Sequence, residues 1–504
     1  MRFALLVSVF VVASCGLAYE LIAAAQSSYL LGDSITQFST VIGVYLFAMG
    51  VGSWLSKYIT RDLPARFIEI EVMVGVLGGF SASGLFLAYA SSAAPFKVIL
   101  YGLVMLIGIL VGLEIPLVMR LLEGEIRFKD LVSQVLSFDY LGALAVSLLF
   151  PLVLAPRLGM ARTALLFGLL NIAVAIWSWT LFRTKVSRPR YLLALCLGSA
   201  VLLLGGFAGA DKLTHLAEHQ LYQDEMILAE TTPYQRIVVT RWKDDYRLFL
   251  NGNLQFSSRD EYRYHEALVH PGLASLPWAR KVAVLGGGDG LAVREILKYP
   301  NIQSVTLVDL DPAMTRLFRD APILRRLNQD SLHSPKVKVI EADAFKWLDT
   351  HPEETFDFIV VDFPDPTNYA LGKLYTNLFY RLLERHLVAQ GRAIIQSTSP
   401  LYARKAFWTV VTTVESVGLN AAPYHVLVPS FGEWGYILVG RDSKEKLAAP
   451  PASIPVPTRF ITPELWPALF TFPADMSRVP AEVNRLDNQQ LVRMFESEWR
   501  QVIR

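Results

Sequence analysis

One glycine-rich segment has the residue types of a nucleoside site. Gly286–Gly290 directly follows the apolar run Lys281–Leu285, and a helical pattern begins after it. Glycines there let the backbone pass close to a ligand at the N-terminus of a helix. Asp309 ends the next apolar run about 19 residues later, where a carboxylate can accept from both ribose hydroxyls. Asp343 and Ala344 follow a third run and are expected to meet the edge of a base.

A second group of residues is acidic. Asp362 and Asp365 stand three residues apart after a fourth apolar run, between prolines that stiffen the turn. Asp289 lies inside the glycine turn, where it would repel a pyrophosphate and attract a sulfonium or an amine. Three such carboxylates favour a cationic substrate. One of them could remove a proton from an ammonium group and leave a nucleophilic amine.

These residues require a parallel sheet to bring them together. Strands alternate with helical segments, which predicts an α/β, Rossmann-like, methyltransferase-type domain over 259–440. An antiparallel hairpin domain is expected over 211–258, with a turn at Asn251-Gly252, and a Pro-rich linker with a C-terminal helix over 441–504. The candidate strands are Lys281–Leu285, Ser304–Val308, Lys336–Ile340, Phe356–Val361 and Arg392–Gln396, with a closing hairpin of Tyr424–Val428 and Trp434–Val439.

The first 210 residues have a different composition. The chain of 504 residues is 53% hydrophobic and 18% charged, with a mean hydropathy of +0.37. Residues 1–210 carry 24 charged side chains and 211–504 carry 68. Seven apolar runs are near the length of about 20 residues that crosses a bilayer as a helix. They are 3–24, 38–56, 67–90, 98–119, 137–156, 163–182 and 191–209. This predicts a multi-pass cell-membrane domain over 1–210 and excludes a single soluble domain.

The orientation of the chain is left with a conflict. Basic residues are concentrated in the loops after the second, fourth and sixth runs, which places the N-terminus in the cytoplasm. Seven spans would then put the globular part outside. Glu20 and Glu114 fall within spans, where an ionisable group is a hypothesis for function, although a structural hydrogen bond is the more common explanation.

Several motifs together resemble a known family. In order along the chain they are Tyr234-Gln235-Arg236-Ile237, Leu250-Asn251-Gly252, Tyr264-His265-Glu266, the Gly286–Gly290 turn and the Asp362–Pro366 turn. This order resembles the spermidine synthases, or polyamine aminopropyltransferases, over about 220–440. More narrowly, the chain resembles the bacterial branch with an N-terminal multi-span membrane domain. It departs from the family pattern at Asn251, Phe363 and Pro364, and at Thr367-Asn368-Tyr369, around the amine-binding part.

The resemblance implies a reaction and roles for residues. The family transfers an aminopropyl group from decarboxylated S-adenosylmethionine, as co-substrate, to putrescine, giving spermidine and methylthioadenosine. Asp362 would be the catalytic proton acceptor. The nucleoside would be held by Gln235, Gly286, Gly288, Asp309, Asp343 and Ala344. The polyamine would be held by Tyr264, His265, Asp289 and Asp365. Because that co-substrate is a cytoplasmic metabolite, the resemblance places the catalytic domain in the cytoplasm, against the loop charges.

Alternatives and exclusions complete the prediction. A methyltransferase using intact S-adenosylmethionine would explain the glycine turn and Asp309, but not the paired carboxylates. A membrane polyamine-binding or transport protein without turnover would explain the apolar half. No metal is expected, because no cluster of ligands is seen. A net charge of +2 argues against nucleic acid as a partner. The expected partners are polyamine and adenosyl-sulfonium substrates, the lipid bilayer and, from the resemblance, a second copy in a homodimer.

Overall fold

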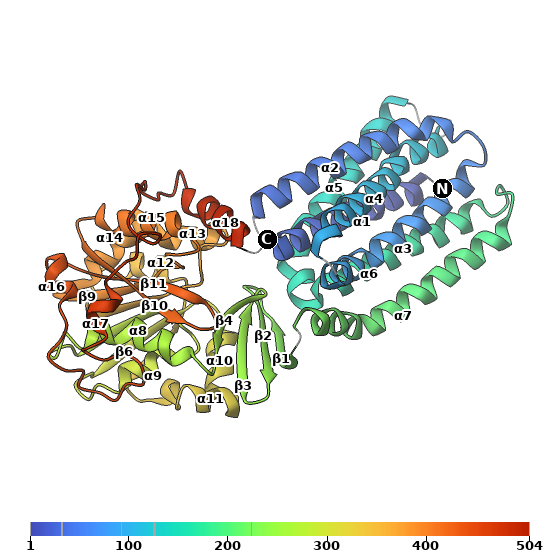
Figure 1. Cartoon of the computed structure of the whole chain (residues 1–504). Coiled ribbons are helices and arrows are strands. Elements are labelled where there is room, and N and C mark those ends of the chain that lie inside the picture. The colour runs from blue at the N-terminus through green and yellow to red at the C-terminus, as the bar shows by residue number, and fades with distance from the viewer. Residues whose placement is uncertain (1, 32–33, 92, 124–127, 223, 503–504) are drawn as a thin grey trace. The chain divides into compact units, whose positions relative to one another are not determined.

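The computed structural model describes residues 1–504 except 1, 32–33, 92, 124–127, 223 and 503–504. The chain forms two compact units, Met1–Glu225 and Met226–Arg504. The first unit is helical and the second contains both sheets (Figure 1). Each unit is described separately below.

Long apolar helices make up the first unit. Six helical stretches of its described residues are long and apolar enough to cross a membrane. The helices are α1 (Arg2–Leu31), α2 (Ser34–Leu55), α3 (Leu63–Ser91), α4 (Ala93–Leu122), α5 (Phe128–Leu149), α6 (Ala155–Phe182) and α7 (Pro189–Leu221).

The count of six differs from the seven predicted runs because two runs join. Runs 137–156 and 163–182 lie in one helical stretch, Lys129–Phe182, of 54 residues. A helix of that length would extend about 80 Å, far more than the ~30 Å of hydrocarbon. The stretch is interrupted by a π-helical segment, Phe150–Leu154, and by Gly159 at φ 73° and ψ 170°. Its two arms, α5 and α6, are each long enough to span.

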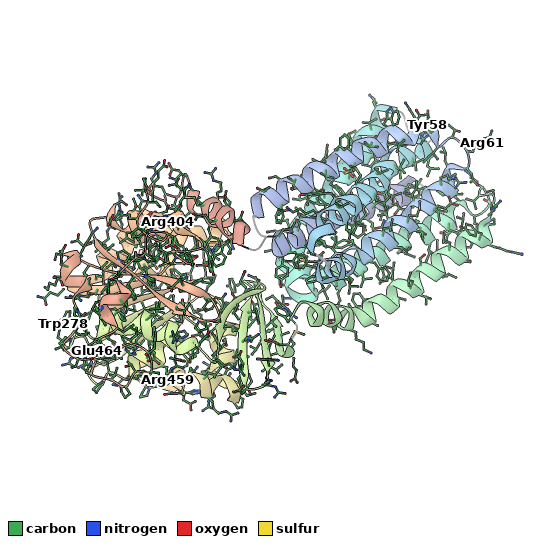
Figure 2. The ribbon with its side chains drawn as sticks, in the orientation of Figure 1. Tyr58, Arg61, Trp278, Arg404, Arg459 and Glu464 are labelled. Atoms are coloured by element: carbon green, nitrogen blue, oxygen red, sulfur yellow. The ribbon has the colours of Figure 1, made fainter. Side chains whose placement is uncertain are left out.

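Glycines bring these helices close together, as expected for helix packing between apolar segments. An added Cβ on Gly52 of α2 would lie 2.0 Å from the carbonyl oxygen of Ile109 on α4. An added Cβ on Gly168 of α6 would lie 2.6 Å from the carbonyl oxygen of Gly75 on α3. Large apolar side chains instead cover the outside of the unit, among them Leu148, which is 55% exposed. At one end of the bundle lie Tyr58 and Arg61 (Figure 2).

The second unit begins with a small antiparallel sheet. Its strands follow one another in the order β1-β2-β3-β4. They are β1 (Glu225–Thr231), β2 (Arg236–Trp242), β3 (Asp245–Leu250) and β4 (Asn253–Ser257). Asn251, at φ 50°, and Gly252, at φ 80°, make the turn between β3 and β4. Two adjacent residues of positive φ form the type of turn predicted for Asn-Gly.

A seven-stranded mixed sheet forms the rest of the unit. Its order is β10-β11-β9-β8-β5-β6-β7, with β11 antiparallel to both its neighbours. The strands are β5 (Lys281–Gly286), β6 (Ser304–Asp309), β7 (Val337–Glu341), β8 (Phe356–Asp362), β9 (Leu387–Gln396), β10 (Asn420–Val428) and β11 (Gly432–Gly440). This confirms the predicted Rossmann-like sheet and its closing hairpin.

Helices cover both faces of this sheet (Figure 1). Along β5, Val282 and Val284 belong to one core while Ala283 and Leu285 belong to the other. Burial on both faces explains why the parallel strands are continuous apolar runs. The helices are α8 (Glu261–Leu273), α9 (Leu291–Leu297), α10 (Pro312–Asp320), α11 (Pro322–Leu327), α12 (Ala344–Thr350), α13 (Tyr369–Gly372), α14 (Asn377–His386), α15 (Arg404–Glu415), α16 (Lys444–Ala448), α17 (Trp466–Leu469) and α18 (Gln490–Val502).

Candidate active site

The register of the sheet places the predicted residues at one edge. Gly286 at the end of β5 pairs with Asp362 at the end of β8. Asp309 at the end of β6 pairs with Glu341 at the end of β7. The strands are parallel, so all these residues lie at the carboxyl edge, where open α/β sheets bind ligands.

The glycine turn brings two carboxylates close to the backbone. Gly286, Gly287 and Gly290 have φ values of 83°, 66° and 75°, which only glycine adopts easily. An added Cβ on Gly287 would lie 3.0 Å from Asp362 Oδ2, and one on Gly288 would lie 2.7 Å from Asp309 Oδ2. Only a backbone without side chains leaves room for both acids at this turn.

Asp309 is fixed by its own backbone surroundings. The N–H of Gly288 donates to Asp309 Oδ2 at 3.0 Å, and the N–H of Asp311 donates to Oδ1 at 2.9 Å. Burial raises the pKa of Asp309 to about 6, although these hydrogen bonds act in the opposite direction. Gln235, in the turn between β1 and β2, donates to Asp311 Oδ2 at 2.9 Å. The small sheet therefore brings Gln235 next to the Asp309 turn, as the assignment to one nucleoside site requires.

Asp343 is placed differently from Asp309. It is the N-cap of α12, accepting from the N–H groups of Phe345 and Lys346, and it pairs with Lys373 at 2.5 Å. Burial acts to raise the pKa of Asp343, but the ion pair and backbone donors outweigh it, and the pKa is lowered. Ala344 begins α12 beside it. Both residues stand after β7, on the Asp309 side of the glycine turn.

The amine-binding candidates form a second cluster. Tyr264, on α8, donates its hydroxyl to Asp362 Oδ1 at 2.7 Å. Burial raises the pKa of Asp362 to about 6; His265 lowers it, Asp289 raises it and the Tyr264 hydrogen bond lowers it. Asp362, Asp289 and His265 therefore interact electrostatically. Burial likewise raises the pKa of Asp289, whose Oδ1 accepts from the N–H of Leu291 at 2.9 Å.

A buried ion network fixes His265 from behind. His265 Nδ1 lies 2.8 Å from Glu261 Oε2, and Arg294 donates to both oxygens of Glu261 at 2.8 and 2.9 Å. Burial acts to lower the pKa of His265, but Glu261 outweighs it, and the pKa is raised. Nδ1 is engaged by Glu261, and His265 also interacts electrostatically with Asp289 and Asp362. Arg294 belongs to α9, directly after the glycine turn, so the network also ties the turn to α8.

Asp365 lies in the turn that follows β8, just beyond Asp362. Burial raises the pKa of Asp365 to about 7, while the polar groups of Gln396 and Thr398 oppose the rise. Its Oδ1 is a buried acceptor with no hydrogen-bond partner among the described residues. Tyr375 connects the two acids, because its hydroxyl lies within electrostatic reach of both Asp362 and Asp365.

The residues around Asp365 were not all predicted as site residues. Gln396 ends β9, next to β8, and its amide nitrogen donates to the carbonyl of Phe363 and to Tyr375. Trp434 donates to Gln396 Oε1 at 3.1 Å. The strand-end rule that located Asp362 would also have located Gln396, since β9 is the next parallel strand. Tyr375 follows no such pattern and is brought in only by the fold.

Residues that depart from the family pattern make structural contacts, both in the turn after β8 and in the turn between β3 and β4. Phe363 is buried and packs edge-to-face on Phe379 at 5.5 Å between ring centroids. The carbonyl of Pro364 accepts from the Tyr375 hydroxyl at 3.0 Å. Asn251 Oδ1 accepts from the N–H of Arg236 at 2.9 Å, so this residue holds the β2 and β3 ends together.

Known proteins resemble this chain over nearly its full length. The polyamine aminopropyltransferase 2 of Ralstonia nicotianae is 57% identical over 506 positions, covering 99% of each chain. The polyamine aminopropyltransferase of Leptospira interrogans is 52% identical over 503 positions, covering 100% of each chain. Among solved structures, a spermidine synthase in complex with the transition-state analogue AdoDATO is 23% identical, with a TM-score of 0.46, over 49% of this chain and 86% of that chain.

A family model agrees with these relatives. The spermine/spermidine synthase domain matches residues 261–448, which include α8, the glycine turn, Asp362 and the closing hairpin. Relatives of more than half identity extend the similarity through the helical unit as well. The chain belongs to the polyamine aminopropyltransferase family.

Proposed function

We propose that this chain transfers an aminopropyl group from decarboxylated S-adenosylmethionine to putrescine or a similar polyamine. With putrescine the products are spermidine and methylthioadenosine. The observation that carries the proposal is that the glycine turn, which contains Asp289, has Asp362 beside Gly287 and Asp309 beside Gly288. His265 interacts electrostatically with both Asp289 and Asp362. The names of the full-length relatives support the same reaction.

The nucleoside part of the co-substrate belongs on the Asp309 side. Asp309 would accept from the ribose hydroxyls, with Gly286 and Gly288 allowing close approach of the backbone and Gln235 closing the site from the small sheet. Asp343 and Ala344 would contact the adenine, and Asp343 would do so while still capping α12. The sulfonium would then lie toward Asp289, whose carboxylate complements a positive charge.

The amine reacts on the Asp362 side. A primary alkylammonium has a pKa near ~10, like that of lysine, so the acceptor arrives protonated. Asp362 takes one proton, which frees the lone pair on nitrogen. The nitrogen forms a bond to the aminopropyl carbon as the carbon–sulfur bond breaks. The electron pair of the carbon–sulfur bond moves to sulfur, which leaves as a neutral thioether. The leaving group is already good, so the protein mainly aligns and deprotonates the amine.

The other end of the polyamine would be held by Asp365. Its Oδ1 has no hydrogen-bond partner among the described residues, so it would accept from the ammonium group at that end. Tyr264 and His265 would line the path between the two acids. We assign the positioning of Asp365 to Gln396 and Tyr375, which bond to each other and to the carbonyls of the turn.

The proposed reaction can be tested with the full chain in detergent. The protein is supplied with decarboxylated S-adenosylmethionine and putrescine, cadaverine or spermidine, and methylthioadenosine is measured by mass spectrometry. We expect stoichiometric methylthioadenosine and aminopropylated amine. Intact S-adenosylmethionine tests the methyltransferase alternative. A methylated product, or polyamine binding without any methylthioadenosine, would exclude aminopropyl transfer.

We further propose that the first unit is a membrane domain and that the catalytic unit faces the cytoplasm. The apolar outer surface of α5 and α7 and the length of the helices support insertion in a bilayer. The cytoplasmic origin of the co-substrate supports the side. The family resemblance also favours a homodimer, which mass photometry of the detergent-solubilised chain would detect as a species of twice the 56.3 kDa chain mass.

A further inference from the structure

Three carboxylates are buried among the described residues of the helical unit. Glu71 of α3 is 0% exposed, Glu114 of α4 is 1% exposed and Glu20 of α1 is 8% exposed. Ionisable groups among apolar helices are costly to bury, and they usually face one another or a functional path. The catalytic site proposed above uses none of them.

Hydrogen bonds and charge effects bring these acids together. Asn171 of α6 donates to Glu71 Oε2 at 2.9 Å, and Tyr19 of α1 donates to Asn171 Oδ1 at 3.3 Å. Tyr19 lies within electrostatic reach of both Glu71 and Glu114. Tyr45 of α2 lies within reach of Glu114 as well. Side chains from five helices thus converge on one place.

Tyr45 also lies within reach of Glu20, and its hydroxyl donates to the carbonyl of Gly16 at 2.8 Å. We call the group the inner acid cluster, and it consists of Glu20, Glu71, Glu114, Asn171, Tyr19 and Tyr45.

The inner acid cluster has more acceptors than donors. Neither oxygen of Glu114 has a hydrogen-bond partner among the described residues, and Oε1 of Glu71 also has none. The ion pairs within the described helices of this unit, Arg66–Glu69 and Arg162–Asp211, do not involve the cluster. A group with several N–H donors and a positive charge would satisfy all three oxygens.

An internal space adjoins the cluster. It has room for about one water-sized group and is lined by Tyr19, Tyr45 and Ser81 together with apolar side chains of α1, α3 and α4. None of the three carboxylates lines this space, which therefore adjoins the cluster only at Tyr19 and Tyr45.

We propose that the inner acid cluster binds the protonated amine end of a polyamine, at a site separate from the transfer site. The oxygens of Glu71 and Glu114 that lack partners accept from the ammonium, and Asn171 orients Glu71. The choice of a polyamine among organic ammonium ions rests on the function proposed for the second unit. The site gives the helical unit a ligand in common with the catalytic unit.

Equilibrium binding of radiolabelled spermidine to the full chain in lipid nanodiscs tests this. We expect two sites per chain in the unchanged protein and one in Glu114→Gln and in Glu71→Gln. The matched control is Glu69→Gln, which removes an equal charge from a partly exposed position of α3. Aminopropyl transfer is measured in the same preparations and is expected to stay within about twofold of the unchanged protein.

The outcomes separate the two proposals. Two sites in Glu114→Gln, or one site already in the unchanged protein, would overturn the inner site whatever the transfer rate. Equal displacement of spermidine by the same concentration of sodium would overturn the choice of an ammonium. Absence of aminopropyl transfer in the unchanged protein and in all variants would contradict the catalytic proposal alone. Should Glu114→Gln not fold, Asn171→Ala keeps both acids, and we expect about tenfold weaker binding at the second site because one hydrogen bond to a charged group is lost.

Discussion

The carboxylate of Asp362 is the group on which the proposed chemistry depends most directly. It sits at the end of β8 against the glycine turn and accepts from Tyr264. In Asp362→Asn the amide cannot take a proton, so we expect turnover to fall at least ~100-fold. Binding of methylthioadenosine should not change, because Asp309 and the turn remain. Steady-state kinetics measure the turnover, and calorimetry measures the binding of methylthioadenosine. Asp244→Asn, at an exposed acid, is the charge-matched control, and full turnover in Asp362→Asn would remove this residue from its role.

The hydrogen bond from Tyr264 should be visible in the pH dependence. Asp362 acts as a base only when ionised, and its pKa is about 6, so kcat/KM for putrescine should fall as the pH falls through about 6. The amine is protonated throughout this range and adds no step of its own. Tyr264→Phe removes a donor that lowers this pKa. The acid limb should therefore move to higher pH, by about one unit. An unchanged midpoint in the variant would show that another group controls the limb.

Some residues of the site could be predicted from the sequence and others could not. The sequence locates Asp289, Asp309 and Asp362 because each ends or follows an apolar run, and parallel strands bring such ends together. Arg294 and Glu261 escape this reasoning. They meet across α8 and α9, and their 2.8 Å contact depends on how two helices pack rather than on spacing.

At the scale of elements, the glycine turn joins the nucleoside side of the site, at Asp309, to the amine side, at Asp362. An added Cβ on Gly288 would displace Asp309, its neighbour at 2.7 Å. We expect Gly288→Ala to lower kcat/KM for decarboxylated S-adenosylmethionine by about 10- to 100-fold, because a small misplacement of a binding group is costly in a positioned reaction. Measurement at saturating putrescine isolates the nucleoside side.

The control for this substitution is Gly418→Ala. Gly418 has φ 88° in the turn between α15 and β10, and no atom lies within 4 Å of an added Cβ. This variant should lose stability through backbone strain but keep its kcat/KM. Equal losses of kcat/KM in both variants would mean that Gly288 matters only for stability.

The strands were easier to predict than the long helices. Strand β5 is buried on both faces, so Val282, Ala283, Val284 and Leu285 form a continuous apolar run that stands out. The junction of α5 and α6 did not stand out in the same way. Pro151 and Pro156 suggest a break between two spans, but the chain there forms a π-helical segment, and the non-helical backbone angles fall at Gly159. Apolar runs predict which residues can enter a membrane but not where helices begin and end.

At the scale of the whole molecule, the chain joins two units whose exposed side chains differ in kind. The first exposes large apolar side chains such as Leu148 and Leu202, whereas most of those in the second are buried in two cores on either face of a sheet. Exposed leucines on helices of this length suit lipid contact. Composition predicts a change of unit at residue 210, where the charge density rises, but α7 continues to Leu221 and the units divide after Glu225. The side of the membrane on which the catalytic unit lies could not be predicted, since it depends on how many arms of Lys129–Phe182 cross.

The orientation of the catalytic unit can be tested with a single thiol. The two native cysteines, Cys15 and Cys196, are buried, so an introduced exposed cysteine is the one that a maleimide reaches first. Asp244 lies in the turn between β2 and β3 with its side chain 83% exposed, and its ion pair with Arg259 contributes little at such a surface. In Asp244→Cys we expect a membrane-impermeant maleimide to label inverted vesicles and to leave intact spheroplasts unlabelled. Labelling of intact spheroplasts would place the unit outside, in agreement with seven crossings and the loop charges, and would require the co-substrate to be supplied there.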